Sequence, residues 1–331
     1  MSYQVRLAGG DCFPADPRQS VLSAALHAGI NLPSDCRQGV CGTCRIRLLE
    51  GRVAYDEPPM ALMPEDEAAG FALACQAHAA SDLVIRMESL ALPPPARRAA
   101  TIQRVERFTP DVLHLELALE APADYLPGQY MKVHLADGTT RNFSMASRPN
   151  GGALDFHVRR IAGGRFTDTT LSKLKPGEQL EVELPLGSFI FRRQDYRPVL
   201  MVVTGTGLAP IRSMLEALLD DPDCPPITLY RGMRCAADLY RDDELRGWHT
   251  RLADFRYVPV LSRGEAAWSG RRGHVQDAVC ADFDDLSDHA IYLCGSPNMI
   301  AQAKQAFRAR GASMDYVYAD GFSFQYQEEL T

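Results

Sequence analysis

Three cysteines stand close together near the start of the chain, at Cys36, Cys41 and Cys44, and a fourth, Cys75, follows after a long interval. Their C-x4-C-x2-C spacing is the one in which thiolates on a tight loop, with one distant thiolate, hold a [2Fe–2S] cluster. Two glycines lie between these cysteines, where a loop that curls around a metal group needs permissive backbone. The four cysteines are therefore predicted to be cluster ligands.

Two other interpretations of these cysteines were weighed. A structural zinc site usually combines two short knuckles such as C-x2-C, and only one is present here. Inert core thiols are a second alternative, but three of them within nine residues of a polar loop is not a core pattern. Because a [2Fe–2S] cluster carries one electron at a time, the rest of the chain is expected to supply electrons.

The composition limits where the protein works and what it binds. The 331 residues are 46% hydrophobic and 23% charged, with a formal net charge of −7, which argues against nucleic acid or an anionic membrane as the main partner. No apolar run approaches the about 20 residues of a membrane span, and no signal-peptide core is present at the start. The remaining cysteines suit a reducing compartment. We expect a cytoplasmic protein with no membrane insertion.

The first part of the chain reads as a small sheet with one helix across it. Alternating apolar residues predict a strand at 3–7, and a helix begins after its N-cap Ser20 and ends at Gly29. One strand follows the cysteine loop and another covers 83–87. This arrangement resembles the plant-type ferredoxin domain, with a β-grasp-like fold, over residues 1–92.

The remaining residues divide into two further regions. Three consecutive prolines mark 93–98 as a linker. Short strands separated by turn residues follow over 99–196, which predicts a compact antiparallel β-barrel. Over 197–331 the pattern changes to buried apolar strands alternating with helices, the organisation of a parallel-sheet α/β domain. The last strand of that domain is expected at 314–318.

Two short motifs lie in the predicted barrel. Arg141-Asn-Phe-Ser144 ends a strand, and its arginine offers a fork of donors suited to a pyrophosphate. Gly163-Gly-Arg-Phe-Thr167 precedes a stretch of helical periodicity that ends near Leu174, and its glycines allow backbone N–H groups to approach phosphate. An arginine on a strand is usually solvated and a Gly-Gly pair is usually a turn, so each motif alone is weak.

Two more motifs lie in the α/β region. Thr204-Gly-Thr-Gly-Leu-Ala-Pro210 follows a buried strand and opens a helix, which is the context of a dinucleotide phosphate turn. Pro210 occupies the place of the third glycine, so a plain Rossmann motif does not fit. Cys294-Gly-Ser-Pro297 ends a later strand.

Taken together and in this order, these motifs resemble those of the ferredoxin–NADP reductase superfamily. The resemblance implies FAD bound by Arg141, Phe143, Ser144, Gly164, Arg165, Phe166 and Thr167. It implies NADH, or NADPH, bound by Gly205, Thr206, Gly207, Pro210, Cys294, Gly295 and Pro297. It also implies catalytic positions for Ser144 near flavin N5, for Cys294 beside the nicotinamide and for Phe322 over the flavin face. Core packing is the alternative for Cys294 and for Phe322.

The order of the three domains resembles that of the reductase components of bacterial multicomponent oxygenases. That resemblance implies an oxidoreductase that passes electrons from NADH to FAD, to [2Fe–2S] and then to a terminal oxygenase component or another one-electron acceptor protein. A reductase for a sugar-deoxygenating dehydratase or a quinone has the same sequence pattern. A non-enzymatic redox sensor is a third reading, but no DNA-binding or signalling segment accompanies the complete set of motifs.

Overall fold

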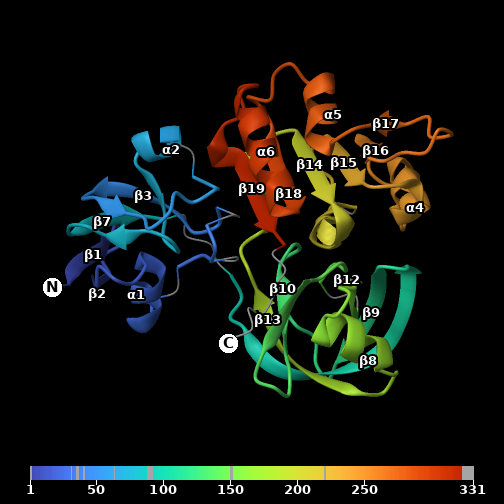
Figure 1. Cartoon of the computed structure of the whole chain (residues 1–331), viewed down its shortest axis with the longest axis horizontal. Helices are drawn as coiled ribbons and strands as arrows, with labels where there is room; N and C mark the ends of the chain where they lie inside the picture. The colour runs from blue at the N-terminus through green and yellow to red at the C-terminus, as the bar shows by residue number, and fades with distance from the viewer. Residues whose placement is uncertain are drawn as a thin grey trace. The chain divides into compact units, whose positions relative to one another are not determined.

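The structure is a computed structural model, and it describes residues 2–30, 32–34, 37–39, 42–62, 64–87, 92–149, 152–219 and 221–322. The chain divides into two compact units, residues 1–91 with 318–331, and residues 92–317. Figure 1 shows the helices and strands of both units.

The first unit is a small mixed sheet with a helix packed on it. Its five-stranded sheet has the order β2-β1-β7-β3-β5, and β1 pairs parallel with β7 but antiparallel with β2. A separate two-stranded sheet joins β4 and β6. The elements are β1 (Tyr3–Leu7), β2 (Cys12–Ala15), α1 (Val21–His27), β3 (Arg45–Glu50), β4 (Val53–Ala54), α2 (Pro64–Ala68), β5 (Phe71–Leu73), β6 (His78–Ala79) and β7 (Leu83–Arg86).

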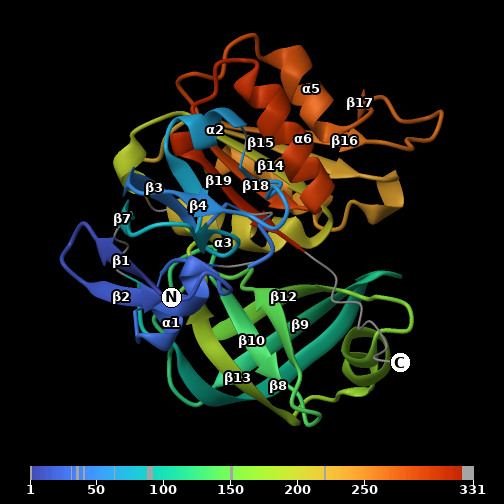
Figure 2. The same cartoon turned by 60° about the vertical axis from the view of Figure 1, so that its left-hand side comes forward.

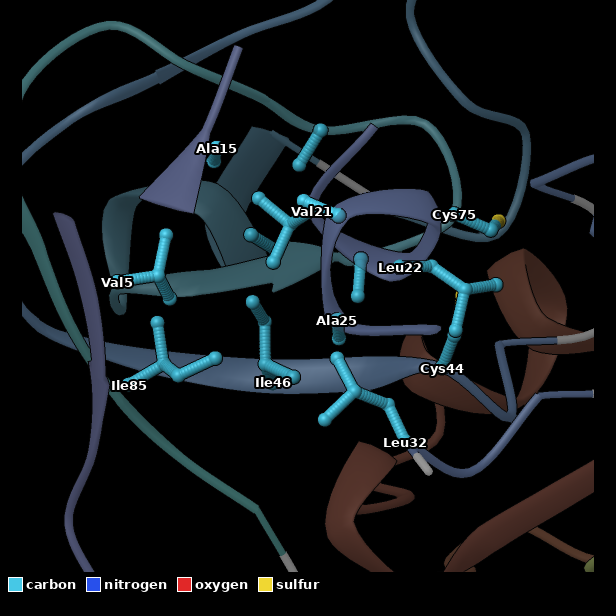
Figure 3. Close-up of a cluster of buried hydrophobic side chains, with 14 of the residues drawn as sticks. Val5, Ala15, Val21, Leu22, Ala25, Leu32, Cys44, Ile46, Cys75 and Ile85 are labelled. Carbon is cyan, nitrogen blue, oxygen red and sulfur yellow. The ribbon is translucent and has the colours of Figure 1, made fainter. Parts of the chain in front are cut away.

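Helix α1 forms where the sequence predicts it. Ser20 is its N-cap, and the Ser20 hydroxyl accepts a hydrogen bond from the Ser23 amide at 3.2 Å. The chain leaves the helix through Gly29, whose φ of 77° is left-handed. Val21, Leu22 and Ala25 are buried against the sheet residues Val5, Ile46 and Ile85, as Figure 3 shows.

The second unit begins with an antiparallel barrel. Its six strands have the order β11-β10-β13-β8-β9-β12. An isolated bridge between Met145 and Phe156 joins the two outer strands and closes the barrel. The strands are β8 (Ala96–Thr109), β9 (Val112–Leu119), β10 (Tyr130–His134), β11 (Thr140–Ser144), β12 (Ala153–Arg159) and β13 (Gln179–Leu186), with short helices η1 (Arg165–Thr170), η2 (Leu171–Lys173) and η3 (Arg193–Asp195).

A sheet of order β17-β16-β15-β14-β18-β19 follows the barrel, and its pairs from β17 to β18 are parallel. The strands are β14 (Val199–Thr204), β15 (Ile227–Met233), β16 (Phe255–Leu261), β17 (Arg271–Arg272), β18 (Ala290–Gly295) and β19 (Val317–Gly321). The helices are η4 (Gly205–Gly207), α3 (Leu208–Leu218), η5 (Ala236–Asp238), α4 (Asp242–Gly247), η6 (Trp248–Thr250), α5 (Val275–Asp282), α6 (Pro297–Arg308) and η7 (Met314–Tyr316). Helix α3 lies between this sheet and the barrel (Figure 2).

The antiparallel barrel and the parallel α/β sheet confirm the predicted fold class. Two local predictions are wrong. The helical stretch expected after Thr167 begins earlier, as a π-helix at Arg165–Thr170, and continues as a 3-10 turn at Leu171–Lys173, so it is not one amphipathic helix. The strand expected at 314–318 starts only at Val317, because residues 314–316 form a 3-10 turn in which the Tyr316 amide bonds to the Ser313 carbonyl.

Candidate functional site

The first part of the candidate site is the cysteine loop. Cys44 directly precedes β3 and Cys75 lies in the turn after β5, and both are buried. The Ala74 amide bonds to the Cys44 carbonyl at 2.9 Å, which ties the two segments together. Figure 3 shows both thiols at one end of the core. Cys36 and Cys41 lie outside the described residues.

The loop folds closely onto its surroundings at Gly39. This glycine has a φ of 69°, and a Cβ at its position would lie 2.8 Å from Pro59 Cβ and 2.9 Å from Gln76 Cγ. Its carbonyl accepts a hydrogen bond from the Ala61 amide at 2.8 Å. The Gln76 side chain donates to the Arg37 carbonyl at 2.9 Å. The loop therefore has no room for a side chain here, which suits a ligand loop held tightly around a cluster.

The second part is the end of barrel strand β11, which carries Arg141, Phe143 and Ser144. Ser144 is buried at 9% exposure, while Phe143 is half-buried with its ring 5.7 Å from that of Phe166. The structure therefore brings the two predicted flavin motifs together through their aromatic residues. The Arg141 guanidinium donates to the neighbouring Thr140 carbonyl at 2.7 Å.

The glycine turn before η1 is the third part. A Cβ on Gly164 would lie 2.9 Å from the Ile161 carbonyl and 3.0 Å from the Thr167 hydroxyl, so only glycine fits. Thr167 is buried, and its hydroxyl accepts a hydrogen bond from the Ile161 amide at 3.2 Å. Because it accepts there, it retains its own proton for donation. Phe166 is buried, and the Arg165 side chain lies outside the description.

The fourth part is formed by two turns that interlock at the ends of β14 and β18. A Cβ on Gly207 would lie 2.4 Å from the Cys294 carbonyl, and one on Gly295 would lie 2.2 Å from the Thr204 hydroxyl. That hydroxyl also accepts a hydrogen bond from the Ser296 amide at 3.1 Å. These turns meet because β14 and β18 are parallel neighbours, so their carboxyl ends lie at the same edge of the sheet.

The residues around these two turns suit a backbone that must approach a ligand closely. Gly205 has a φ of 58°, and Thr206 is buried. Pro210 lies in the first turn of α3 and Pro297 begins α6, positions where a missing N–H breaks no helical hydrogen bond. The Cys294 side chain is fully buried. Phe322 follows β19 and is half-buried.

Sequence reasoning missed a group of charged residues between the barrel and the α/β sheet, in which His114 and Arg212 are buried and Asp155 and Arg241 are half-buried. Asp155 lies 2.6 Å from His114, 3.3 Å from Arg212 and 3.6 Å from Arg241. Burial alone would raise the pKa of Asp155, but its hydrogen bond with His114 and the nearby cations lower this pKa to about 2. The polar residues of α3 and β12 read as solvated faces in the sequence, so no local signal could have revealed this group.

The imidazoles near Asp155 differ in their charge. For His114, burial opposes protonation, but the bonds to Asp155 and Glu106 outweigh it and raise its pKa. For His157, burial dominates and holds its pKa well below the ordinary value, so this ring is neutral. Tyr240 is buried beside His157, and burial raises the pKa of its hydroxyl to about 12. Tyr240 therefore acts as a neutral hydrogen-bonding group.

Comparison with protein families and known proteins agrees with this layout. Three family models match: a 2Fe-2S iron-sulfur cluster binding domain at residues 8–80, an oxidoreductase FAD-binding domain at 99–191 and an oxidoreductase NAD-binding domain at 201–305. They confirm the predicted cofactors, [2Fe–2S], FAD and a nicotinamide nucleotide. Among the described residues, no helix is long and apolar enough to cross a membrane.

Curated relatives match along nearly the whole chain. Reductase component 1 of terephthalate 1,2-dioxygenase from Comamonas is 37% identical, over 98% of each chain. The CDP-6-deoxy-L-threo-D-glycero-4-hexulose-3-dehydrase reductase of Yersinia pestis is 33% identical, over 97% of this chain and 99% of the relative. Among solved structures, the Amycolatopsis cytochrome P450 reductase GcoB is 31% identical with a TM-score of 0.73, covering 97% of this chain and 98% of its own.

Proposed function

Because the chain belongs to the ferredoxin–NADP reductase superfamily, in the group with an N-terminal 2Fe-2S domain, we propose that it is the NADH-dependent reductase component of an oxygenase system. It is an NAD(P)H-dependent oxidoreductase whose electrons pass from the nicotinamide nucleotide through FAD to the cluster. The proposal adds the recipient, a terminal oxygenase component. It also assigns residues 1–92 to the ferredoxin domain, 93–98 to a linker, 99–196 to the flavin domain and 197–331 to the nicotinamide domain.

When bound, FAD would supply a two-electron acceptor for the nicotinamide hydride and a one-electron donor for the cluster. The protein holds these groups and excludes water and dioxygen. Cys36, Cys41, Cys44 and Cys75 hold the irons in this proposal. The two buried thiols and the loop that packs closely at Gly39 support that assignment.

The flavin is held by the end of β11 and the turn before η1. Arg141 and the Gly164–Thr167 segment bind the FAD phosphates, because the turn excludes a Cβ and keeps the Thr167 hydroxyl proton for donation. Phe143 packs against the flavin or its ribityl chain. Ser144 donates a hydrogen bond near flavin N5. The Arg141 guanidinium uses one of its five N–H donors on the Thr140 carbonyl, which leaves others for phosphate.

The nicotinamide nucleotide is held by the two interlocked turns. Residues Gly205, Thr206 and Gly207 approach its pyrophosphate, and Cys294 with Gly295 lines the place of the nicotinamide. The 2.4 Å from a Gly207 Cβ to the Cys294 carbonyl supports this most directly, because a turn packed this closely brings backbone rather than side chains to the ligand. Phe322 covers the flavin face that the nicotinamide reaches.

We infer a terminal oxygenase component as the electron acceptor from the 37% identity to a terephthalate dioxygenase reductase along 98% of both chains. The test starts with the protein reduced by one equivalent of NADH under anaerobic conditions. Candidate oxygenase components are then added, and cluster reoxidation is timed by visible absorption. We expect an oxygenase component to reoxidise the cluster fast. Control proteins that accept no electrons from a ferredoxin domain should leave the cluster reduced. Reduction of the flavin without any reoxidation by oxygenases would refute the assigned recipient.

A reductase for a sugar-deoxygenating dehydratase is the second candidate, supported by the 33% identity to the Yersinia pestis dehydrase reductase. The same reoxidation assay separates the two. A dehydratase with its bound sugar nucleotide would reoxidise the cluster faster than any oxygenase component if this second candidate were correct.

A further inference from the structure

Arg212 joins the two halves of the candidate site. It lies on α3, which starts directly after the Gly205–Gly207 turn, and its side chain is buried. Its guanidinium donates to the Ala146 carbonyl at 2.8 Å. It also contacts Asp155 at 3.3 Å, Glu216 at 2.6 Å and Glu244 at 2.9 Å. A single side chain therefore contacts the barrel, its own helix and α4.

The barrel segment that receives these bonds continues directly from the predicted flavin strand. Ala146 is two residues beyond Ser144, and the Ala146 amide bonds to the Asp155 carbonyl at 2.7 Å. The next residue, Ser147, accepts a hydrogen bond at its carbonyl from the Ser213 hydroxyl at 2.6 Å. Two successive residues of α3 are thus hydrogen-bonded to the backbone that follows the flavin motif.

Tyr240 forms a second link, from the barrel to the nucleotide turn itself. Its hydroxyl donates to the Gly205 carbonyl at 3.4 Å and lies 3.3 Å from His157 Nδ1 on β12. When the Tyr240 hydroxyl donates a hydrogen bond to the Gly205 carbonyl, the Nδ1–H group of His157 can donate one to the Tyr240 oxygen, because a neutral imidazole carries one N–H. Arg231, fully buried, donates to the Tyr240 carbonyl at 2.6 Å and holds the residue from the sheet side.

Separating these charged groups would cost free energy. Asp155, Glu216 and Glu244 surround the buried Arg212, and Asp155 and Glu244 also pair with the half-buried Arg241. Removing one partner would leave another charge buried without compensation. Contacts of this kind oppose movement of α3 against the barrel. They therefore fix the position of the nucleotide turn relative to the flavin strand.

We propose that Arg212 and Tyr240 are positioning residues for hydride transfer, which hold the nucleotide-binding turn at a fixed place against the flavin-binding strand. The proposal rests on the proposed function, because it concerns the approach of the nicotinamide to the flavin. Hydride transfer requires the reacting atoms to lie about 3–3.5 Å apart, and a misplacement of about 1 Å can cost about 100-fold in rate. The two links act on the backbone of both half-sites and touch neither reactant.

Tyr240→Phe tests the proposal, since it removes only the hydroxyl. Stopped-flow mixing with NADH gives the limiting rate of flavin reduction and the apparent Kd for NADH separately. We expect the limiting rate to fall about tenfold, a partial form of the misplacement penalty, with Kd changed by less than about threefold. FAD and iron contents should equal those of the wild type.

Tyr230→Phe is the matched control. Tyr230 is also buried on the α/β sheet, but its hydroxyl donates to Asp282 on α5 and not to the nucleotide turn. This variant should keep the wild-type limiting rate. Equal rates in the two variants, or a Tyr240→Phe defect confined to Kd, would overturn the proposal.

Arg212→Lys supplies a second, independent variant, because lysine keeps the charge but cannot make the same set of planar contacts. It should also slow the limiting rate, and a folded Arg212→Lys protein with the wild-type rate would count against Arg212. If it does not fold, Tyr240→Phe decides. A wild-type flavin that NADH does not reduce would instead refute the proposed function, so the two failures can be told apart.

Discussion

At the scale of single residues, Gly207 is a position in the candidate nucleotide turn where the structure leaves no room for a side chain. Its Cβ would lie 2.4 Å from the Cys294 carbonyl and 3.0 Å from the Gly295 amide nitrogen, both backbone atoms that cannot rotate away. Gly207→Ala should therefore destabilise the protein by about 1–3 kcal/mol, the usual range for overpacking. It should also raise the KM for NADH, because the two turns must separate. Urea unfolding and NADH–ferricyanide kinetics measure the two effects.

Gly247→Ala provides the control for that substitution. Gly247 ends α4 with ordinary helical backbone angles, and no atom lies within 4 Å of an added Cβ. Alanine should leave the KM unchanged and stabilise the protein by about 0.4–1 kcal/mol through the unfolded state. A Gly207→Ala variant that behaves like Gly247→Ala would show that the interlocked turns are looser than the structure indicates.

Arg234 and Arg263 are the residues at which we expect NADH and NADPH to be distinguished. Their backbones are adjacent, since the Arg263 amide bonds to the Arg234 carbonyl at 2.7 Å, and both residues are exposed. In contrast to these two residues, Arg272 uses its guanidinium to donate hydrogen bonds to the carbonyls of Gly264, Glu265 and Trp268. Charge alone would favour a 2′-phosphate here, whereas the resemblance to oxygenase reductases favours NADH.

We predict a higher kcat/KM for NADH than for NADPH, measured at one ionic strength because salt screens an arginine–phosphate attraction. Arg263→Ala should lower the kcat/KM for NADPH several-fold and leave that for NADH within about twofold. Arg256→Ala is the control, since Arg256 pairs with Asp282. A preference for NADPH that Arg263→Ala abolishes would show that NADPH is the natural donor.

At the scale of secondary-structure elements, the sequence predicts those whose cause is local. Ser20 caps α1 because its hydroxyl reaches an amide three residues on, and the apolar run at β14 indicates a strand buried on both faces. The π-helix after Gly164 could not be predicted in this way. Its residue Asp168 accepts hydrogen bonds from Arg160 and from the Gly163 amide, contacts that no periodicity in the sequence indicates.

The pairing of β9 with β12 should make stability depend on pH. His114 on β9 faces Asp155 on β12, Glu106 on β8 and Arg241, and its pKa is raised in the folded protein. A raised pKa means that the charged imidazole stabilises the fold below its unfolded pKa of about 6.5 and that this stabilisation is lost as pH rises through the folded pKa. His157 contributes in the opposite sense, because burial holds its pKa well below the ordinary value and the fold loses stability when the unfolded imidazole takes up a proton.

The stabilisation that His114 contributes should accordingly decline as the pH rises from about 6 to about 8, while His157 and His289, whose pKa values burial lowers, act in the opposite direction. His114→Gln should therefore be less stable than the wild type by most at pH 6, and this difference should shrink as the pH rises. Urea unfolding at several pH values, with His249→Gln as an exposed-histidine control, measures the difference. Parallel pH profiles for the wild type and His114→Gln would mean that the ion pair with Asp155 does not depend on protonation of His114.

At the scale of the whole molecule, the sequence predicted the cofactors and the fold class but not how the flavin barrel and the α/β sheet are joined. The motifs around Arg141 and Gly205 are continuous stretches, so they can be recognised one at a time. Arg212, Tyr240 and Asp155 come from three separate segments, and their meaning arises only when folding brings them together. The ligand assignments at Cys36, Cys41, Cys44 and Cys75 remain predictions.

The division into separate cofactor domains predicts that the cluster can be removed without stopping hydride transfer. Cys75 is buried beside the chain that contains Cys44 and is assigned as the distant ligand. Cys75→Ser should lose the visible absorption and the reduced-state paramagnetic signal of the cluster. NADH–ferricyanide activity should stay within about threefold of the wild type, because reduced FAD can pass electrons directly to that acceptor. Reduction of a cluster-dependent acceptor protein should fall to background.

Cys12→Ser serves as the control, since Cys12 is an exposed thiol in the same unit and is not an assigned ligand. It should keep the cluster signals and both activities. If Cys75→Ser loses flavin reduction together with the cluster, the two redox groups depend on each other for folding. If Cys75→Ser keeps the full paramagnetic signal, Cys75 is not a ligand, and one of the other cysteines must take its place. Retained flavin reduction with an absent cluster is the result that the arrangement of the chain predicts.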